Sequence, residues 1–294
     1  MNVLSLFDGM SCGQIALDRL GVRVDQYFAA EIDKYAIQVA KKNYPNTQHI
    51  GNVLDVKGED LPKIDLLIGG SPCQGFSFAG KQLNFDDPRS KLFFEFVRLL
   101  KETKPKYFLL ENVRMKKEYQ DVISEHLGVE PVMICSSLVS AQSRKRLYWT
   151  NISGLIQPED KGIVLKDILE DGVSDRPCEP KEFKQDSTCH HAATATDIKG
   201  NDSIKRVYAD SGKSPTLTTM GGGHREPKVL VEQLTYRKLT PVECMRLQTV
   251  DDDYFDDTGI SNTQRYKLLG NGMTVDVICH LLKGIKAEFA RKVA

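Results

Sequence analysis

Short apolar runs alternate with segments of helical spacing through the first 135 residues, and this alternation limits the possible folds more than any other feature. We expect strands at residues 3–6, 27–30, 64–68, 107–110 and 132–135, and helices at 14–20, 33–43 and 90–102. Strands and helices that alternate in this way form a parallel sheet with helices on both faces. The first half therefore predicts an α/β fold with a Rossmann-like sheet, which binds ligands at the carboxyl ends of its strands.

The character of the chain changes near residue 154. Residues 157–230 are rich in Asp, Lys, Ser, Thr, Gly and Pro and have few long apolar periods. We expect a second, smaller, loop-rich domain with short strands here, although a disordered segment has a similar composition. A helical pattern returns at residues 275–289. We therefore predict a first domain at 1–156, a second at 157–260, and a segment at 261–294 that returns to the first.

Composition excludes several classes of protein. The 40 Lys and Arg balance the 40 Asp and Glu, and 40% of the residues are hydrophobic, which is typical of a globular chain rather than a histone-like one. No stretch approaches 18 apolar residues and residues 1–6 do not resemble a signal peptide, so we expect a cytoplasmic protein with no membrane anchor. Seven cysteines without a C-x-x-C pair, and Cys189-His190-His191 without a second ligand pair, indicate reduced thiols and no metal site.

The segment from Leu4 to Gly13 indicates a ligand site. A strand runs into a turn that contains Gly9 and then into a helix, which is where a Rossmann-like unit places a nucleotide. The segment is not G-x-G-x-x-G, so a dinucleotide fits poorly. Glu31 ends the next strand at a spacing suited to ribose hydroxyls, and Asp55 is a third candidate. These residues favour a nucleoside cofactor without a diphosphate, and a tight turn in any α/β protein explains them equally well.

Three further segments carry reactive or charged side chains. Cys73 follows a buried strand in the loop Gly-Gly-Ser-Pro-Cys-Gln-Gly, which places a thiol at the ligand-binding edge rather than in a core. Glu111 ends the apolar run 107–110. Gln142, Arg144 and Arg146 alternate, so they share one face if the chain is extended there. Taken singly, the last two segments are also explained by a polar strand end and a solvated basic loop.

Taken in order, these four segments resemble the motif series of the cytosine-5 DNA methyltransferases. The resemblance continues in residues 237–248 (RKLTPVECMRLQ) and 268–275 (LLGNGMTV), and it covers residues 1–153 and 237–283. The size resembles that of bacterial and phage members. The Phe7-Asp8-Gly9 opening, residues 92–96 and Ser261-Asn262 resemble the catalytic domain of the animal de novo DNA methyltransferases. Ser11 stands where many bacterial members have a second glycine, which the animal relatives also lack.

The resemblance implies a fold, a cofactor and a set of site residues. The sheet is expected to be that of the S-adenosylmethionine-dependent methyltransferases, with a target-recognition domain at 157–260. The implied cofactor contacts are Phe7, Asp8, Gly9, Ser11, Glu31, Ile32, Asp55, Val56, Pro72, Leu92, Asn271 and Met273. The implied catalytic residues are Cys73, Glu111, Arg144, Gln142 and Arg146, and the implied DNA contacts are Gln74, Ser77, Lys81, Arg146, Thr216, Gly222 and Arg225.

The resemblance also implies a mechanism. The Cys73 thiolate adds to carbon 6 of a flipped-out cytosine, carbon 5 takes the methyl group of S-adenosylmethionine, and S-adenosylhomocysteine is the product. Glu111 binds ring nitrogen 3 and the exocyclic amine, and Arg144 holds the base carbonyl and helps to orient Cys73. Gln142 and Arg146 support the loop and the DNA backbone. The glycine-rich residues 214–225 resemble the recognition loop of the family, although each of them also suits an ordinary surface loop.

The implied partner is double-stranded DNA, bound by a monomer. A cognate restriction endonuclease that does not contact this chain is one expected companion. Two alternatives stay open: methylation of tRNA by the same chemistry, and a catalytically inactive accessory relative. The variable segment and the Pro-Cys-Gln loop favour DNA, and the presence of Cys73, Glu111 and Arg144 argues against an inactive relative.

The zero net charge is composed of unlike parts. Residues 81–117 hold ten basic and five acidic side chains, residues 131–158 hold three basic and no acidic ones, and residues 199–228 hold six basic and three acidic ones. These stretches contain or adjoin the Cys73 loop, the arginine segment and the presumed recognition loop. We therefore predict a positive cleft that sets the salt dependence of DNA binding.

Overall fold

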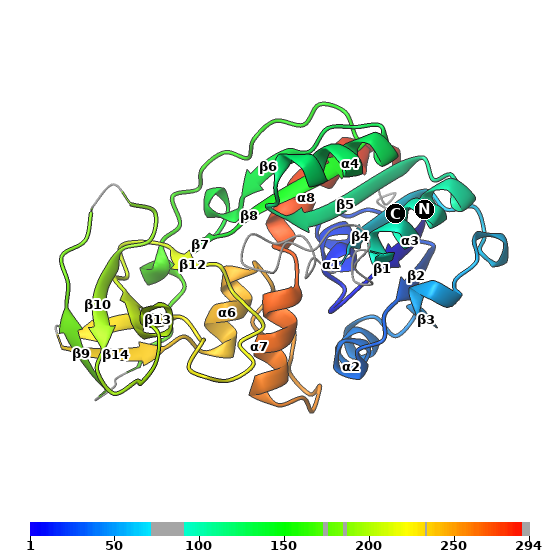
Figure 1. Cartoon of the computed structure of the whole chain (residues 1–294). Coiled ribbons are helices and arrows are strands. Elements are labelled where there is room, and N and C mark those ends of the chain that lie inside the picture. Colours follow the sequence, from blue (N-terminus) through cyan, green and yellow to red (C-terminus); the bar gives the residue numbers. More distant parts are fainter. Residues whose placement is uncertain (72–90, 173–175, 185–186, 233, 290–294) are drawn as a thin grey trace. The chain divides into compact units, whose positions relative to one another are not determined.

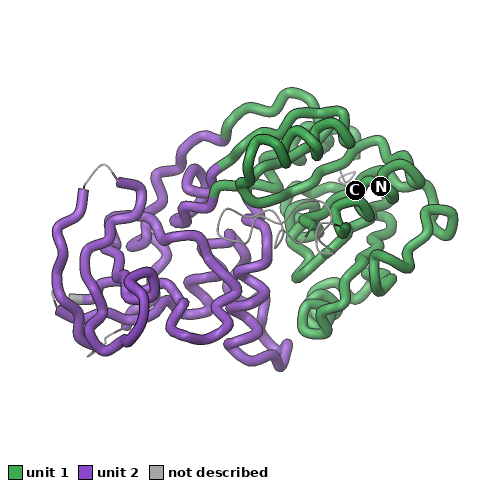
Figure 2. Tube along the Cα trace, in the orientation of Figure 1, with its two compact units in different colours: residues 1–134, 145–157, 277–294 green, residues 135–144, 158–276 purple. Residues whose placement is uncertain are grey.

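The computed structural model describes residues 1–71, 91–172, 176–184, 187–232 and 234–289. Its contacts divide the chain into two compact units (Figure 2). Unit 1 comprises residues 1–134, 145–157 and 277–294, and unit 2 comprises residues 135–144 and 158–276. Residues 135–144 and 261–276 thus cluster with unit 2. The functional domain boundaries that we expect after residues 156 and 260 stay predictions.

Unit 1 is built on a seven-stranded sheet in the order β3-β2-β1-β4-β5-β8-β6 (Figure 1). The strands are β1 (Asn2–Leu6), β2 (Gln26–Ala30), β3 (Gln48–Gly51), β4 (Leu66–Gly70), β5 (Tyr107–Val113), β6 (Val132–Cys135) and β8 (Lys145–Thr150). The pairs β2–β3, β1–β2, β1–β4 and β4–β5 are parallel, as predicted, whereas β5 and β8 are antiparallel. The apolar runs did not predict β3 or β8. β3 has a single large apolar residue, Ile50.

Unit 1 carries the helices α1 (Cys12–Arg19), α2 (Lys34–Asn43), α3 (Lys91–Thr103) and α4 (Lys117–Leu127), with short 3-10 turns at Val53–Asp55 and Gly58–Asp60. Asp33 caps α2, because its side chain accepts a hydrogen bond from the backbone N–H of Tyr35 (2.9 Å). The apolar face of α3, with Phe93 and Phe96, packs into a core that also holds Leu4 and Leu110. These contacts follow from the helical spacing that predicted α3.

The C-terminal helix α8 (Val275–Phe289) forms where the pattern at 275–289 predicted a helix, and from residue 277 onward it clusters with unit 1. The backbone carbonyl of Phe289 accepts a hydrogen bond from Arg23 N (2.8 Å). Gly284 lies so close to Ile152 that an added Cβ would come within 2.7 Å of its side chain. Within the described residues, no helix is long and apolar enough to cross a membrane.

Unit 2 contains a small closed barrel in the order β10-β11-β13-β14-β9. Its strands are β9 (Arg176–Pro180), β10 (His191–Ala195), β11 (Arg206–Tyr208), β13 (Lys228–Glu232) and β14 (Thr235–Lys238). The barrel core is small, with Cys178, Val207 and Tyr236 among its members. This arrangement agrees with the predicted loop-rich domain of short strands and not with a disordered segment.

Outside the barrel, β7 (Gln142–Ser143) and β12 (Ser214–Pro215) form a two-stranded parallel pair. The helices of unit 2 are α5 (Asp202–Lys205), α6 (Pro241–Leu247) and α7 (Asn262–Asn271), with 3-10 turns at Ser136–Leu138 and Leu165–Asp167. The start of α6 is encoded locally. Pro241 occupies the first turn, and Thr240 and Glu243 each bind the backbone N–H of the other in a capping box.

Candidate active site

The parallel register of unit 1 brings several predicted site residues to one edge of the sheet. Leu6 pairs with Ala30 on β2 and with Gly69 on β4, and Gly70 pairs with Glu111 on β5. The chain segments that follow these strands therefore begin side by side. The segments after β1 and β2 carry predicted cofactor residues. The segment after β4 is the one that precedes Cys73 in the sequence.

The turn after β1 has an unusual backbone. Phe7, Gly9 and Ser11 have φ values of 56°, 59° and 63°, in the left-handed region. Glycine adopts this conformation at no steric cost, but a residue with a Cβ does not. Ser11 is fully buried and occupies the N-cap position directly before α1. The position where many bacterial members carry glycine is therefore one where a glycine backbone is favoured, and Ser11 needs compensating contacts.

Asp8 supplies these contacts. Its carboxylate accepts hydrogen bonds from Ser5 Oγ (2.6 Å), Ser11 Oγ (2.6 Å) and Tyr27 Oη (2.8 Å). Burial raises the pKa of the Asp8 carboxyl, and the three hydrogen bonds oppose the rise. Asp8 is only 6% exposed, so in this structure it holds the turn together rather than facing solvent. The sequence did not predict the roles of Ser5 and Tyr27, because a polar residue within an apolar strand does not reveal which group its side chain binds.

Glu31 connects the turns after β1 and β2. Its Oε2 accepts a hydrogen bond from Gly9 N (2.8 Å), and its Oε1 accepts from the backbone N–H groups of Ile32 and Asp33 (2.7 Å each). Ile32 is 74% exposed, which is unusual for a large apolar side chain beside a buried turn. The turn thus presents a fixed carboxylate next to an open apolar surface.

The other predicted cofactor residues differ in exposure. Asp55 is exposed at the end of a 3-10 turn, Val56 is buried, and Leu92 on α3 is half-buried. Asn271 and Met273 belong to unit 2, at and after the end of α7. Pro72 lies outside the described residues, as do Cys73, Gln74, Ser77 and Lys81.

Glu111 forms an ion pair with Arg146 in unit 1. Arg146 Nε lies 2.8 Å from Glu111 Oε1, and each side chain is 13% exposed. The antiparallel pairing of β5 and β8 places Arg146 opposite Val113, so the first residues of β8 reach the carboxyl end of β5. A sheltered carboxylate held by a guanidinium suits recognition of a planar polar group. The pair was not predicted.

The segment that leads to Cys73 begins beside this pair. An added Cβ on Gly70 would lie 3.1 Å from Glu111 Oε2, so a larger residue would crowd the carboxylate. Ser71 is buried, and its hydroxyl accepts a hydrogen bond from Asn112 Nδ2 (3.1 Å). Cys73 follows Ser71 by two residues in the chain.

Gln142 and Arg144 belong to unit 2, whereas Arg146 belongs to unit 1. Gln142 is fully buried and donates from Nε2 to Leu247 O (3.1 Å). The Arg144 guanidinium is also buried and donates to backbone carbonyls of unit 2. Gln142 and Arg144 both bind the backbone of Leu217, whereas Arg146 pairs with Glu111. Glu111 thus pairs with Arg146, and the expected contacts of Arg144 with the base carbonyl and Cys73 stay predictions.

The predicted recognition loop is partly anchored. The Thr216 hydroxyl donates to Ser143 O (2.7 Å), so in this structure it serves the pairing of β7 and β12. Gly222 and Arg225 are exposed, and Gly222 has a φ of 92°. Lys228, just beyond the loop, donates from Nζ to His224 O (2.7 Å). The loop therefore presents Gly222 and Arg225 while its ends are tied down.

The structure corrects the charge argument in part. Arg144, Lys213 and Lys228, which were counted in the basic stretches, are 3%, 9% and 2% exposed. Each donates hydrogen bonds to backbone carbonyls, as Lys213 Nζ does to Ser137 O (2.7 Å). They stabilise loops rather than add to a surface that attracts DNA. The positive cleft itself stays a prediction.

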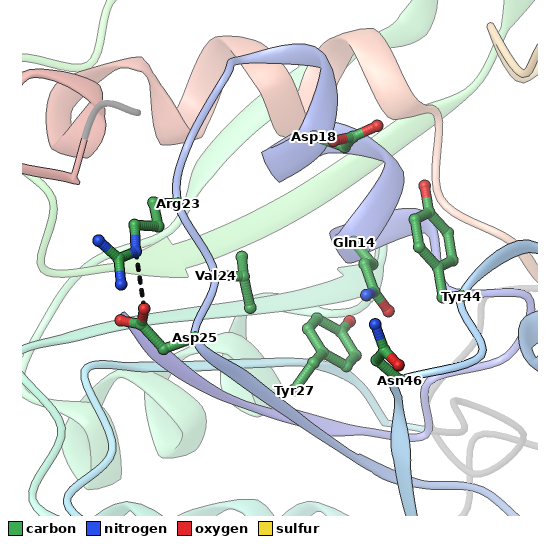
Figure 3. A pocket seen from close by; sticks show the side chains of 8 residues that line it. All are labelled: Gln14, Asp18, Arg23, Val24, Asp25, Tyr27, Tyr44 and Asn46. Atoms are coloured by element: carbon green, nitrogen blue, oxygen red, sulfur yellow. Dashed lines mark hydrogen bonds and ion pairs between the residues drawn. The ribbon is translucent and has the colours of Figure 1, made fainter. Parts of the chain in front are cut away.

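A separate pocket of about 490 Å³ is lined by residues of α1, of β2 and the segment before it, and of the segment before β3 (Figure 3). Its lining residues are Gln14, Asp18, Arg23, Val24, Asp25, Tyr27, Tyr44 and Asn46. Arg23 pairs with Asp25 there (2.8 Å). Tyr27 lines the pocket and also binds Asp8, so the pocket adjoins the contacts that hold the turn. None of the predicted site residues lines it. Among the described residues, no group of His, Cys, Asp and Glu is arranged to hold a metal.

Comparison with known proteins identifies the class. Residues 1–287 match the family described as C-5 cytosine-specific DNA methylase. The type II methyltransferase M.Bsp6I of Bacillus sp. (strain RFL6) is 30% identical, and the match covers 97% of this chain and 98% of that one. The orphan methyltransferase M.SPBetaI of Bacillus phage SPbeta is 28% identical, with 99% of both chains covered.

Solved structures share the fold. A DNA modification methyltransferase described as putative, encoded within an E. coli prophage, superimposes with a TM-score of 0.70 at 22% identity, covering 98% of this chain and 99% of that one. A mutant of DNMT2 from Spodoptera frugiperda gives a TM-score of 0.72 at 22% identity, with 97% and 99% covered. The predicted fold class, the sheet of the S-adenosylmethionine-dependent methyltransferases, is confirmed. The chain belongs to the C-5 cytosine-specific DNA methylases, and it is a DNA cytosine-5 methyltransferase.

Proposed function

We propose that this protein transfers a methyl group from S-adenosylmethionine to carbon 5 of a flipped-out cytosine in a specific duplex DNA sequence. The observation that carries the proposal is the sheltered pair of Glu111 and Arg146, which lies beside Gly70, three residues before Cys73. A cytosine offers an amine that can donate to a carboxylate oxygen, a ring nitrogen that can take a proton from the carboxyl group, and a carbonyl that a guanidinium can bind. Glu111 and Arg146 would both bind the base, one on each side of its polar edge.

The turn after β1 and β2 fits S-adenosylmethionine. Glu31 is fixed by three backbone N–H groups, which leaves its carboxylate oriented for ribose hydroxyls. Ile32 is an exposed apolar side chain that an adenine ring would cover. Phe7, Asp55, Val56 and Leu92 complete the contacts of unit 1, and Pro72, Asn271 and Met273 are proposed by family resemblance. When bound, the cofactor supplies an electrophilic methyl group.

Cys73 would act as the nucleophile. Its thiolate adds to carbon 6 of the base, which makes carbon 5 nucleophilic enough to take the methyl group. The carbon 5 proton then leaves to a base, and the bond between sulfur and carbon 6 breaks, so the thiolate is regenerated. Glu111 stabilises the enamine through ring nitrogen 3 as charge develops. A stacked base is out of reach, so the cytosine must first be flipped out, which costs a few kcal/mol.

Unit 2 would read the target sequence. The exposed Gly222 and Arg225 are proposed to contact DNA, and Gln74, Ser77 and Lys81 are proposed contacts from the Cys73 loop. Thr216 is proposed to act near a phosphate, although its hydroxyl is bound to Ser143 O in this structure. The relatives include orphan and type II methyltransferases, so a solitary role and a role paired with a restriction endonuclease are both compatible with the proposal.

Replacement of Cys73 by Ser tests the proposal. We expect methyl transfer to duplex DNA to be lost while S-adenosylmethionine still binds, as measured by transfer of a tritiated methyl group and by calorimetry. Glu111→Gln is expected to retain weak activity, because an amide can donate a hydrogen bond to ring nitrogen 3 but cannot transfer a proton to it as negative charge develops there. Full activity of the Cys73→Ser protein would overturn the covalent mechanism.

Two further measurements separate the alternatives. Bisulfite sequencing of DNA from cells that express the protein reports activity and the target site together. Transfer to tRNA but not to duplex DNA would favour an RNA substrate. Absence of transfer to both, with cofactor binding intact, would favour an accessory protein.

A further inference from the structure

A buried arginine connects two segments of unit 2 that the proposed function treats separately. Arg144 is 3% exposed. Its Nη1 donates to Leu217 O (3.0 Å), and its Nη2 donates to Gly270 O (3.1 Å) and Gly272 O (2.9 Å). Leu217 belongs to the proposed recognition loop, whereas Gly270 and Gly272 flank Asn271, a proposed cofactor contact. One guanidinium thus binds both segments.

Two glutamines reinforce the same junction. Gln142 accepts a hydrogen bond from Leu217 N at Oε1 (2.8 Å) and donates from Nε2 to Gln248 Oε1 (3.2 Å). Gln248 in turn donates from Nε2 to Leu269 O (2.6 Å) and Gly272 O (3.1 Å). Both glutamines are fully buried. A second chain of hydrogen bonds therefore runs from the recognition loop to the end of α7.

The two segments also touch directly through their backbones. An added Cβ on Gly270 would lie 1.9 Å from Thr218 O and 2.8 Å from Thr219 N. A side chain at this position is therefore excluded unless the recognition loop moves away. The contact leaves little room for one segment to shift without the other.

The chemistry of arginine suits this junction better than that of lysine. A buried backbone carbonyl without a hydrogen-bond donor destabilises the folded state. The planar guanidinium offers five N–H groups in a fixed fork, so it reaches carbonyls on both sides at once. A lysine ammonium is a point donor on a flexible stem and cannot hold both sides in one geometry.

We propose that Arg144 is a positioning residue that couples the recognition loop, residues 214–225, to the cofactor turn, residues 270–273. Ordering of the turn by the cofactor orders the loop, and binding of target DNA to the loop strengthens cofactor binding by the same factor. The proposal rests on the proposed function of the two segments. The Arg144 guanidinium binds carbonyls within unit 2, whereas Arg146 pairs with Glu111 within unit 1.

The test is the coupling between two ligands of the full-length protein. The affinity for S-adenosylhomocysteine is measured by calorimetry with and without a duplex that contains the site mapped by bisulfite sequencing. A duplex that lacks the site controls for nonspecific charge. We expect the target duplex to tighten wild-type binding by about fivefold or more. In Arg144→Lys and in Gly270→Ala the ratio is expected to fall to about one.

Arg246→Lys is the matched control. Arg246 also lies in unit 2 and binds a backbone carbonyl, that of Ile168 (2.9 Å), but it has no part in the junction. Its coupling ratio is expected to equal that of wild type. Loss of the ratio in Arg246→Lys as well would point to general destabilisation and overturn the proposal.

Hydrogen exchange of the wild-type protein gives a readout that needs no variant to fold. S-adenosylhomocysteine alone is expected to slow exchange in residues 216–220 as well as in 269–274. An unchanged coupling ratio in Arg144→Lys, or no protection of 216–220 in wild type, would overturn the proposal. Failure of the proposed function looks different, because wild type would then bind no S-adenosylhomocysteine or transfer no methyl group.

Discussion

The two units stabilise their backbones in different ways. In unit 1 the strands pair in one large sheet, and the core between the sheet and its helices is apolar, with Phe93, Phe96 and Trp149 fully buried. In unit 2 the regular elements are short, and much of the buried backbone lies in loops. Within the described residues, the buried Lys, Arg and Glu side chains all belong to unit 2, as Arg144 and Glu243 illustrate.

The difference shows how an irregular fold meets the demand that buried backbone groups be hydrogen-bonded. A sheet satisfies its own carbonyls, whereas a buried loop needs donors from elsewhere. Lys213 donates to the carbonyls of Ser137, Ser140 and Ile163, and Lys228 donates to those of His224 and Glu226. Basic side chains therefore serve as internal donors in unit 2, which explains why a count of charges along the sequence overstates its basic surface.

The largest effect is expected from the apolar core of unit 1. Phe96→Ala removes a fully buried ring of α3 and should lower the free energy of unfolding by about 3–5 kcal/mol. Trp149, the single tryptophan, is buried in the same core, so its fluorescence in urea reports this loss. If the variant unfolded at the wild-type urea concentration, the dominance of apolar packing in unit 1 would be refuted.

The next effect tests the buried polar contacts of unit 2. Glu243 is fully buried and accepts two hydrogen bonds from Arg237, at 2.6 and 2.9 Å. Arg237→Met leaves that carboxylate without its cation and should cost about 3 kcal/mol. Hydrogen exchange in β14 and α6 measures the loss.

Arg246→Met is the matched control for that variant. It breaks a pair with Asp252, whose side chain is 49% exposed, and an exposed pair contributes only about 0–1 kcal/mol. Equal effects of the two variants would show that burial does not set the strength of these contacts.

A pH titration isolates a third contribution. Burial lowers the pKa of Lys228 from 10.5 to about 8; the nearby cations Lys238 and Arg176 lower it further, and the carboxylates of Glu226 and Asp197 oppose the drop. Between these two values the unfolded chain binds the proton more tightly, so stability rises with pH. Relative to Lys228→Met, wild type should gain about 1.4 kcal/mol per pH unit in this window. A constant difference between the two proteins from pH 7 to 10 would contradict this expectation.

The smallest effect concerns the polar contacts of unit 1. Tyr27→Phe removes one of the three hydrogen bonds to Asp8 and should cost about 1 kcal/mol. S-adenosylmethionine binding should weaken only slightly, because Ser5 and Ser11 still hold the carboxylate. Calorimetry and thermal unfolding check both points. A loss as large as that of Phe96→Ala would remove the contrast between the units.

Much of unit 1 could be predicted from the sequence, because periodicity reports which strands and helices form. The edge that gathers Glu31 and Glu111 follows from parallel strand order. Strand direction has no such signature, so the reversed β8 and the partner of Arg146 were missed. In unit 2 the sequence suggests that a charged residue such as Arg144 is exposed to solvent. Only the fold shows that backbone carbonyls, rather than water, bind its guanidinium.

The reversal of β8 has a wider consequence for which side chains can reach the site in a sheet of this kind. A forward strand brings its final residues to the ligand-binding edge, but a reversed strand brings its first ones, here Arg146 opposite Val113 at the end of β5. Thr150, the last residue of β8, pairs with Leu109 and so lies away from this edge. The direction of a strand therefore decides which of its ends lies at the ligand-binding edge. An antiparallel strand in a mainly parallel sheet places its N-terminal side chains there.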